Sequence, residues 1–397
     1  MTPKPVILLL AVCATVLLEQ GCAGPMRKEA VPPALTTQAV VPGLPDVRYR
    51  VGIDTDALRK DAIDSFWKEI AYLKASGHKG KLPPAVFLAV SGGGDDGAFS
   101  AGLLNGWTAA GDRPQFKLVT GVSTGALIAP FAFLGPSYDD RLKRFYTEVS
   151  PSDIEKKRSL IAALTSDALA DNAPLRKLVE KEVDQGFLDA VAAEQEKGRM
   201  LLIATTDLDA RQAVLWNMTK IAASGDPKAL DLFRSIMIGS AAIPGAFPPM
   251  MIDVEVNGRT YQEMHVDGGT MAQVFVYPPS LHVKEAAEKH HVARERRAYV
   301  IRNARLDPEW AQVDRRTLSI GERAISSLIE TQGIGDLYRI YLEAERDGVD
   351  FNLAFIPASF NAPHREEFDT DYMRALYRKG YELTANGYPW EKVPPGF

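Results

Sequence analysis

Cysteine is almost absent from this chain of 397 residues, which contains only Cys13 and Cys22, both near the N-terminus. The residues after Cys22 can therefore form neither an internal disulfide nor a cysteine-ligated metal site. No group of histidines and carboxylates has the spacing of metal ligands. Basic residues are not in excess, because the net charge is -5 at pH 7. We therefore expect no metal, no cofactor and no nucleic-acid partner.

An apolar run of the length needed to span a membrane is missing from the N-terminal region. The run from Val6 to Leu18 is too short for a spanning helix and suits the hydrophobic region of a secretion signal. Gly21-Cys22 follows, as in bacterial lipoprotein signals, although Glu19 stands where an aliphatic residue is usual. We expect residues 1–21 to be a signal peptide and Cys22 to carry a lipid anchor, on an exported protein of the cell envelope. An ordinary cleaved signal with an incidental cysteine is one alternative, and a buried N-terminal helix is another.

The rest of the chain divides into regions of different pattern. Residues 22–50 are rich in proline and sustain no hydrophobic period, which predicts a tether. Residues 51–82 predict an N-terminal helical segment, because apolar residues recur every three or four positions. Beyond residue 83 short apolar runs alternate with helical patterns, which predicts an α/β layered fold. Strands are predicted at 85–90, 117–120, 200–205, 213–216, 297–302 and 351–356, and helices at 97–110, 124–134, 315–346 and 370–385.

Ser123 is the central residue of Gly121-Val122-Ser123-Thr124-Gly125, which lies between an apolar strand and an apolar helix. In that context Gly-x-Ser-x-Gly is typical of the nucleophile elbow of serine hydrolases. Gly121 and Gly125 have no Cβ atom, so the strand and the helix can approach each other closely. The dipole of the following helix favours negative charge at the serine. The pattern alone is common, but its context predicts that Ser123 is a nucleophile.

Three consecutive glycines, Gly92, Gly93 and Gly94, also lie between a predicted strand and a predicted helix. Their backbone N–H groups could form the oxyanion hole that acyl transfer requires. A phosphate-binding loop is an alternative, but the Gly-Lys-Ser/Thr ending of such loops is missing, and Asp95 and Asp96 would repel a pyrophosphate. A flexible turn is the second alternative.

Asp267 is followed by Gly268 and Gly269. An aspartate at the end of a strand can present its carboxylate to a cleft and act as general base for a serine. Taken alone, an Asp-Gly turn is the simpler interpretation. A histidine base is a further possibility in chain order, but the histidines after Asp267 show no motif, and His265 is better explained as a structural residue.

Together the glycine loop, the serine elbow and Asp-Gly-Gly resemble the hallmarks of the patatin-like phospholipase family, in the same order and over about residues 83–305. The stretch from Gly239 to Pro249 is similar to a small-residue and Pro-Phe-Pro segment of that family. The resemblance implies a three-layer α/β patatin-like sandwich with a mainly parallel central sheet. It implies a catalytic domain at 83–305 and a mostly helical C-terminal extension at 306–397 packed on the same domain.

The resemblance also implies the chemistry of the site. Ser123 and Asp267 would form a dyad without a catalytic histidine, and Gly92 to Gly94 would form the oxyanion hole. One departure concerns Asp96, which stands where the family usually has arginine or lysine. A carboxylate facing a developing oxyanion would be unfavourable. We expect the two acidic side chains to point away while the backbone N–H groups bind.

The predicted activity is hydrolysis of phospholipids or other acyl esters through an acyl-Ser123 intermediate, by a protein tethered to a membrane. Two alternatives stay open at this stage. One is a membrane-tethered protein with the same fold that is inactive or weakly active and serves interaction, for which Asp95 and Asp96 are the support. The other is an esterase without lipid preference.

Overall fold

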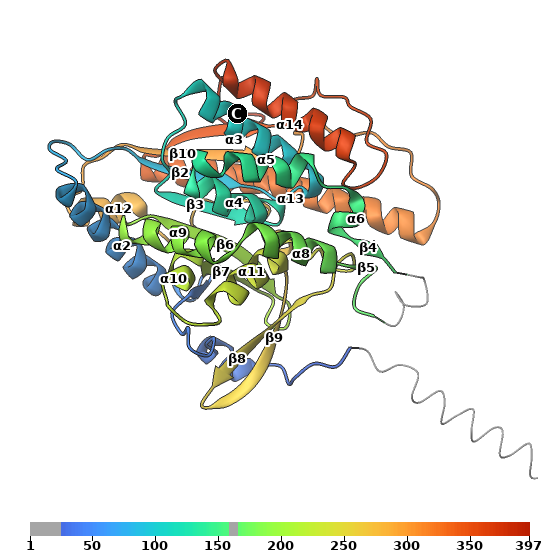
Figure 1. Cartoon of the computed structure of the whole chain (residues 1–397), viewed down its shortest axis with the longest axis horizontal. Coiled ribbons are helices and arrows are strands. Elements are labelled where there is room, and N and C mark those ends of the chain that lie inside the picture. The colour runs from blue at the N-terminus through green and yellow to red at the C-terminus, as the bar shows by residue number, and fades with distance from the viewer. Residues whose placement is uncertain (1–24, 159–165) are drawn as a thin grey trace, which may run out of the picture.

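A nine-stranded sheet runs through the computed structural model, which describes residues 25–158 and 166–397 (Figure 1). The predicted signal peptide, residues 1–21, and Cys22 lie outside the described residues. The strands are β1 (Arg48–Arg50), β2 (Ala85–Val90), β3 (Leu118–Val122), β4 (Lys156–Lys157), β5 (Ala170–Asp171), β6 (Met200–Asp207), β7 (Gln212–Asn217), β8 (Met250–Val256), β9 (Arg259–Asp267), β10 (Arg296–Arg302) and β11 (Asp350–Phe355). Of these, β4 and β5 form a separate two-stranded sheet.

Helices connect and cover the strands. The α-helices are α2 (Thr55–Ala75), α3 (Gly97–Ala110), α4 (Thr124–Leu134), α5 (Asp139–Thr147), α6 (Pro151–Ile154), α8 (Ala173–Glu182), α9 (Gln185–Glu196), α10 (Met218–Ala222), α11 (Ala229–Ser240), α12 (Val283–Lys289), α13 (Thr317–Asp347) and α14 (Thr370–Ala385). Short 3-10 turns are η1 (Pro33–Gln38), η2 (Gly94–Asp96), η3 (Pro136–Tyr138) and η4 (Gly268–Thr270).

The centre of the large sheet is parallel. Strands β6, β3, β2, β10 and β11 are neighbours in this order, and each pair is parallel. Antiparallel strands extend the sheet beyond β6. There β7 pairs with β6, and β1 pairs with β7. At its carboxyl end β6 also pairs with β9, which in turn pairs with β8. All six residues of β2 are buried, as expected for a parallel strand that is covered on both faces.

Side chains of β2 alternate between two hydrophobic cores, which defines three layers. Leu88 and Val90 belong to the core that includes Leu103 of α3, whereas Phe87 and Ala89 pack in a second core with Leu337 of α13. In Figure 1 α3, α4 and α14 lie over one face of the sheet, and α13 lies behind it. The prediction of a three-layer α/β sandwich with a mainly parallel central sheet is confirmed.

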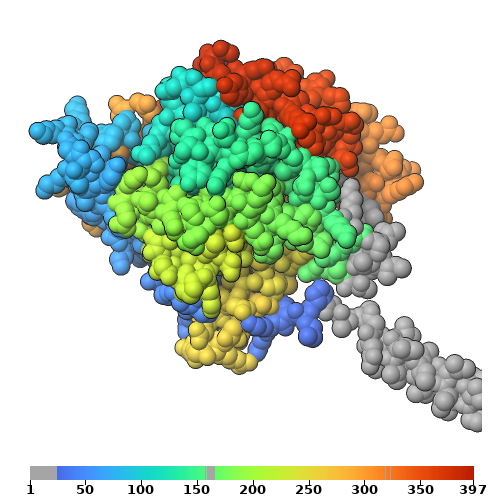
Figure 2. All heavy atoms as spheres, in the orientation of Figure 1, coloured from blue at the N-terminus to red at the C-terminus, as the bar shows by residue number. Residues whose placement is uncertain are grey.

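The tether predicted for residues 22–50 is corrected in the described part of the chain. Val31, Leu44 and Val47 are buried in the main core, and β1 pairs with β7. Arg27 forms an ion pair with Asp209. In Figure 2 this blue N-terminal segment lies against the yellow β8–β9 hairpin. Composition misled the prediction, because isolated apolar residues between prolines show no period although they pack on the domain.

The predicted C-terminal extension, residues 306–397, takes part in the same fold. β11 is the edge strand beside β10 in the central sheet, and α14 packs along α3. The hydroxyl group of Tyr377 on α14 accepts a hydrogen bond of 2.9 Å from the side-chain amide of Asn105 on α3. Residues 83–305 and the predicted extension therefore share one sheet and both hydrophobic cores.

Candidate active site

Ser123 lies on a sharp turn between β3 and α4, at the carboxyl end of the strand. Its φ of 55° is in the left-handed region, which strains a residue other than glycine. The turn is possible because its flanking glycines leave no room for side chains. A Cβ atom at Gly121 would lie 2.4 Å from the carbonyl oxygen of Gly125, and one at Gly125 would lie 2.1 Å from that of Val90. Both glycines therefore occupy the structural role that the sequence predicts.

The structure brings Ser123 and Asp267 together although 144 residues separate them. The Ser123 hydroxyl group donates a hydrogen bond of 2.6 Å to Oδ2 of Asp267. Asp267 ends β9, which lies beside β6 so that Thr205 is opposite Asp267. The other carboxylate oxygen, Oδ1, accepts a hydrogen bond of 2.7 Å from the Gly269 N–H. Asp267 is thus held by the Asp-Gly-Gly turn with one oxygen directed at the serine.

Burial raises the pKa of Asp267 to about 7, because its charged form loses hydration, while the hydrogen bonds from Ser123 and Gly269 act in the opposite direction. Asp267 is only 5% exposed. A carboxylate whose pKa lies near neutrality is a stronger base than an ordinary aspartate and still ionises at physiological pH. Asp267 is therefore suited to accept the proton of Ser123.

Ser240 holds the backbone of Ser123 in place. Its hydroxyl group accepts a hydrogen bond of 3.0 Å from the Ser123 N–H and donates one of 2.6 Å to the carbonyl oxygen of Ala204. Ser240 belongs to the small-residue stretch from Gly239 to Pro249, but no local pattern in that stretch predicts this contact. Its position links the elbow to β6 and α11.

The glycine loop partly departs from the prediction. The prediction that Gly92 is an oxyanion-hole donor is corrected. Its N–H group already donates a hydrogen bond of 3.0 Å to the carbonyl oxygen of Gln273. Within the described residues, the N–H groups of Gly93 and Gly94 have no such partner. Both have positive φ angles, of 150° and 58°, and a Cβ atom at Gly93 would lie 2.1 Å from the carbonyl oxygen of Asn303. Two of the three predicted donors therefore remain available for an oxyanion.

Asp95 and Asp96 bind the C-terminal part of the chain. Oδ2 of Asp95 accepts hydrogen bonds of 2.8 Å from Nε2 of His364 and from the Phe368 N–H. Asp96 accepts a hydrogen bond from the Tyr372 hydroxyl group. The pKa of Asp96 is raised to about 7, mainly by burial. The acidic pair that departs from the family pattern thus anchors the glycine loop to residues about 270 positions away.

An apolar cavity of about 40 Å³ opens beside Ser123 and Gly94. Its walls combine residues of α4 and α5, the segment after α11, and the C-terminal region: Leu127, Phe145, Tyr146, Ile243, Phe247, Phe368 and Met373. Sequence reasoning missed Phe368 and Met373, since neither belongs to a motif. The apolar wall suits contact with the part of an acyl group next to the ester, whereas the enclosed volume is smaller than a whole acyl chain.

None of the histidines hydrogen-bonds to Ser123 among the described residues. His265 is fully buried and contacts Thr205 through Nδ1 at 2.8 Å and Glu263 through Nε2 at 3.0 Å. Glu263 also pairs with the buried Arg48. Burial alone would raise the pKa of Glu263, but the hydrogen bond to His265 and the charge of Arg48 outweigh it and lower the pKa to about 2. His265 therefore belongs to a structural network rather than to the site.

Residues 88–278 match the family model of the patatin-like phospholipases. The matched stretch contains the glycine loop, the serine elbow and the aspartate that the fold brings together. The chain carries a patatin-like phospholipase domain. This domain includes both Ser123 and Asp267.

Two solved structures are similar to this chain more distantly. VipD from Legionella pneumophila is 13% identical with a TM-score of 0.40, and the match covers 77% of this chain and 66% of VipD. The type III effector protein ExoU is 13% identical with a TM-score of 0.22, and the match covers 77% of this chain and 53% of ExoU. The chain thus spans less than two thirds of the length of either structure. No curated protein matches the sequence.

Residues 25–158 and 166–397 contain no group of three or more histidine, cysteine, aspartate or glutamate residues placed to hold a metal ion. No helix in this part of the chain is both long and apolar enough to cross a membrane.

Proposed function

We propose that the patatin-like domain hydrolyses lipid acyl esters with a Ser123–Asp267 dyad. The observation that carries the proposal is the 2.6 Å hydrogen bond between the serine hydroxyl group and a buried carboxylate of raised pKa. A hydroxyl group is a weak nucleophile unless a base accepts its proton as the new bond forms. Asp267 is the base placed to do so.

The reaction has two half-steps. Ser123 Oγ attacks the ester carbonyl carbon and its proton moves to Asp267, while the N–H groups of Gly93 and Gly94 stabilise the oxyanion. The intermediate collapses, the C–O bond to the alcohol breaks, and Asp267 returns the proton to the leaving oxygen. Water then attacks the acyl-Ser123 ester, giving its proton to Asp267, which passes it to Ser123 as the fatty acid leaves.

The first carbons of the substrate's acyl chain would contact the apolar wall formed by Leu127, Phe247 and Phe368, and the rest of the chain would extend beyond this small cavity. The apolar wall supports an acyl ester as substrate. The alternative of an inactive interaction protein loses its support, because the carboxylates of Asp95 and Asp96 are engaged by His364, Phe368 and Tyr372. An esterase without lipid preference is distinguished by comparing rates on micellar and monomeric forms of one ester.

The N-terminal sequence supports a location for this activity. We propose that the protein is exported, that residues 1–21 are removed and that Cys22 is lipidated, which would place the domain at a membrane of the cell envelope. A Cys22→Ala variant is expected to lose the lipid mass and to leave the membrane fraction. An unchanged mass and fractionation would contradict the anchor.

A fluorophosphonate probe tests the proposed nucleophile. Labelling of the purified protein, together with hydrolysis of a short p-nitrophenyl ester, is expected to disappear in Ser123→Ala. Ser327→Ala is the matched control, because Ser327 is exposed on α13 and donates only to the Arg323 carbonyl oxygen. Full labelling or full hydrolysis in Ser123→Ala would contradict the proposal.

A further inference from the structure

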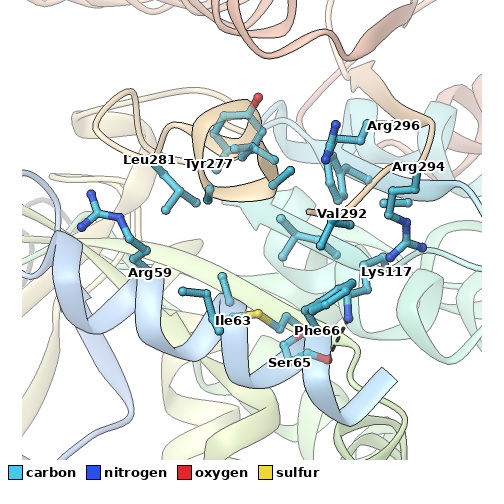
Figure 3. Close-up of a pocket in the computed structure, with 18 of the residues that line it drawn as sticks. Arg59, Ile63, Ser65, Phe66, Lys117, Tyr277, Leu281, Val292, Arg294 and Arg296 are labelled. Carbon is cyan, nitrogen blue, oxygen red and sulfur yellow. Dashed lines mark hydrogen bonds between the residues drawn. The ribbon is translucent and has the colours of Figure 1, made fainter. Parts of the chain in front are cut away.

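A second apolar cavity, of about 170 Å³, lies between α2 and α12, over the amino ends of three central strands (Figure 3). Ala85 begins β2, Leu118 begins β3 and Met200 begins β6, and all three line the cavity. Ser123 follows the opposite end of β3. Ser123 lies five positions after Leu118 along the extended chain, which corresponds to a distance of about 16 Å. The cavity is therefore separate from the proposed catalytic site.

Carbon atoms form most of its wall. Figure 3 shows Ile63 and Phe66 projecting from α2 toward Tyr277, Leu281 and Val292 on the opposite side. A dry apolar cavity of about 150 Å³ is large enough to bind benzene. The present cavity is somewhat larger, so an apolar chain would occupy it in preference to ordered water, which would find few polar partners there.

The charged side chains in the cavity wall are all basic: Arg59, Lys117, Arg294 and Arg296. Among the described residues, no carboxylate lines the cavity. Lys117 and Arg294 both form ion pairs with Glu69, at 3.0 and 2.9 Å. Arg59 pairs with the exposed Asp56. Positive charge therefore remains in excess at the cavity.

Arg296 is the basic group of the wall whose side chain makes no hydrogen bond or ion pair with another described residue, although it is half-buried at the start of β10. The charge of Asp347 acts on it only at longer range, and Asp347 is itself paired with Arg346. Arginines in such positions are usually paired, because an unpaired buried charge costs free energy. Arg296 would gain from an anion, and a planar carboxylate can accept two hydrogen bonds from its guanidinium group.

We propose that this cavity binds a single-chain carboxylate of the fatty-acid class. Its chain would occupy the apolar space between α2 and α12, and its carboxylate would pair with Arg296. A neutral amphiphile would fill the same space but leave Arg296 unpaired. The site lies apart from Ser123, so binding there does not depend on hydrolysis.

Calorimetric titration of the full chain with hexanoate, octanoate and decanoate, below their micelle concentrations, tests the proposal. The affinity is expected to rise about fourfold for each added methylene until the cavity is filled. Decanol is expected to bind at least about tenfold more weakly than decanoate. Equal affinity for decanol, or affinity that does not depend on chain length, would overturn the proposal.

Variants locate the bound decanoate. Arg296→Gln is expected to weaken binding at least about tenfold, whereas Arg297→Gln is the matched control, because Arg297 is exposed on the other face of β10 and pairs with Glu295. Ala286→Leu adds side-chain volume to the cavity wall on α12, and this variant is also expected to weaken decanoate binding. Circular dichroism checks that each variant is folded.

One further variant separates this site from the acyl cavity beside Ser123. Ile243→Trp narrows that acyl cavity and is expected to leave decanoate binding unchanged. Loss of binding in Ile243→Trp but not in Arg296→Gln would place the decanoate beside Ser123 and overturn the proposal. Because no turnover is needed, this result is independent of whether Ser123 is a nucleophile.

Discussion

The pH dependence of ester hydrolysis provides a direct test of Asp267 as the general base. Its pKa is raised to about 7 by burial, and the base is active only when it is ionised. Activity should therefore be full above this pKa and be lost as the pH falls through it. With a pKa of about 7, roughly 1% of the base is ionised at pH 5, so kcat/KM there should be about 100-fold below its plateau.

The assay is the hydrolysis of a short p-nitrophenyl ester between pH 5 and 9, with log kcat/KM plotted against pH. A slope of one below about pH 7 is expected for the loss of one proton. Asp267→Asn should lower the plateau by about 10² to 10⁴-fold, the range for removal of a positioned base, and should abolish the step. Circular dichroism at each pH verifies that the protein remains folded.

Other carboxyl groups titrate in the same range, so a control is needed. Glu343 on α13 also has a pKa raised to about 7, mainly by burial, but it lies among Arg339, Arg346 and Asp347 rather than at the site. Glu343→Gln should leave the step in place. A profile without a step in the native protein, or a step that survives in Asp267→Asn and vanishes in Glu343→Gln, would refute the assignment.

Three further predictions concern the supports of the site. His364→Gln should lower kcat by about tenfold with an intact fold, because it loosens the loop held through Asp95; equal kcat would show that this contact does not position the loop. Gly125→Ala should destabilise the protein by more than about 3 kcal/mol in urea unfolding, since the added Cβ would meet backbone; near-native stability would contradict the tight elbow. Arg48→Met should cost about 3–5 kcal/mol by leaving buried Glu263 without its cation, and an unchanged unfolding curve would show that the pair is dispensable.

Local signals in the sequence were sufficient to predict much of the fold. The apolar run at 85–90 and the helix at 370–385 have the same bounds as β2 and α14. The serine elbow also had a strong local signal, because its glycines are required by steric contact within one turn. The pairing of Ser123 with Asp267 was inferred through the family resemblance, since no local pattern connects residues 144 positions apart.

The features that were missed or wrong depend on contacts between distant parts of the chain. The Gly92 N–H is taken by the carbonyl oxygen of Gln273, and Asp95 is bound by His364 and Phe368. A hydrogen bond between residues about 180 or 270 positions apart produces no pattern in the sequence around either residue. The packing of residues 27–50 was hidden for the same reason, because each apolar residue there contacts a different part of the domain.

The packed N-terminal segment limits how far the domain can reach from a membrane. A free tether from Cys22 to residue 50 would span up to about 100 Å when extended. Because Arg27 is already bound to Asp209, it lies only five positions after Cys22, and those five steps of extended chain reach at most about 18 Å. If Cys22 is lipidated, the domain is confined to the surface of the bilayer that holds its anchor and cannot act on an opposing membrane.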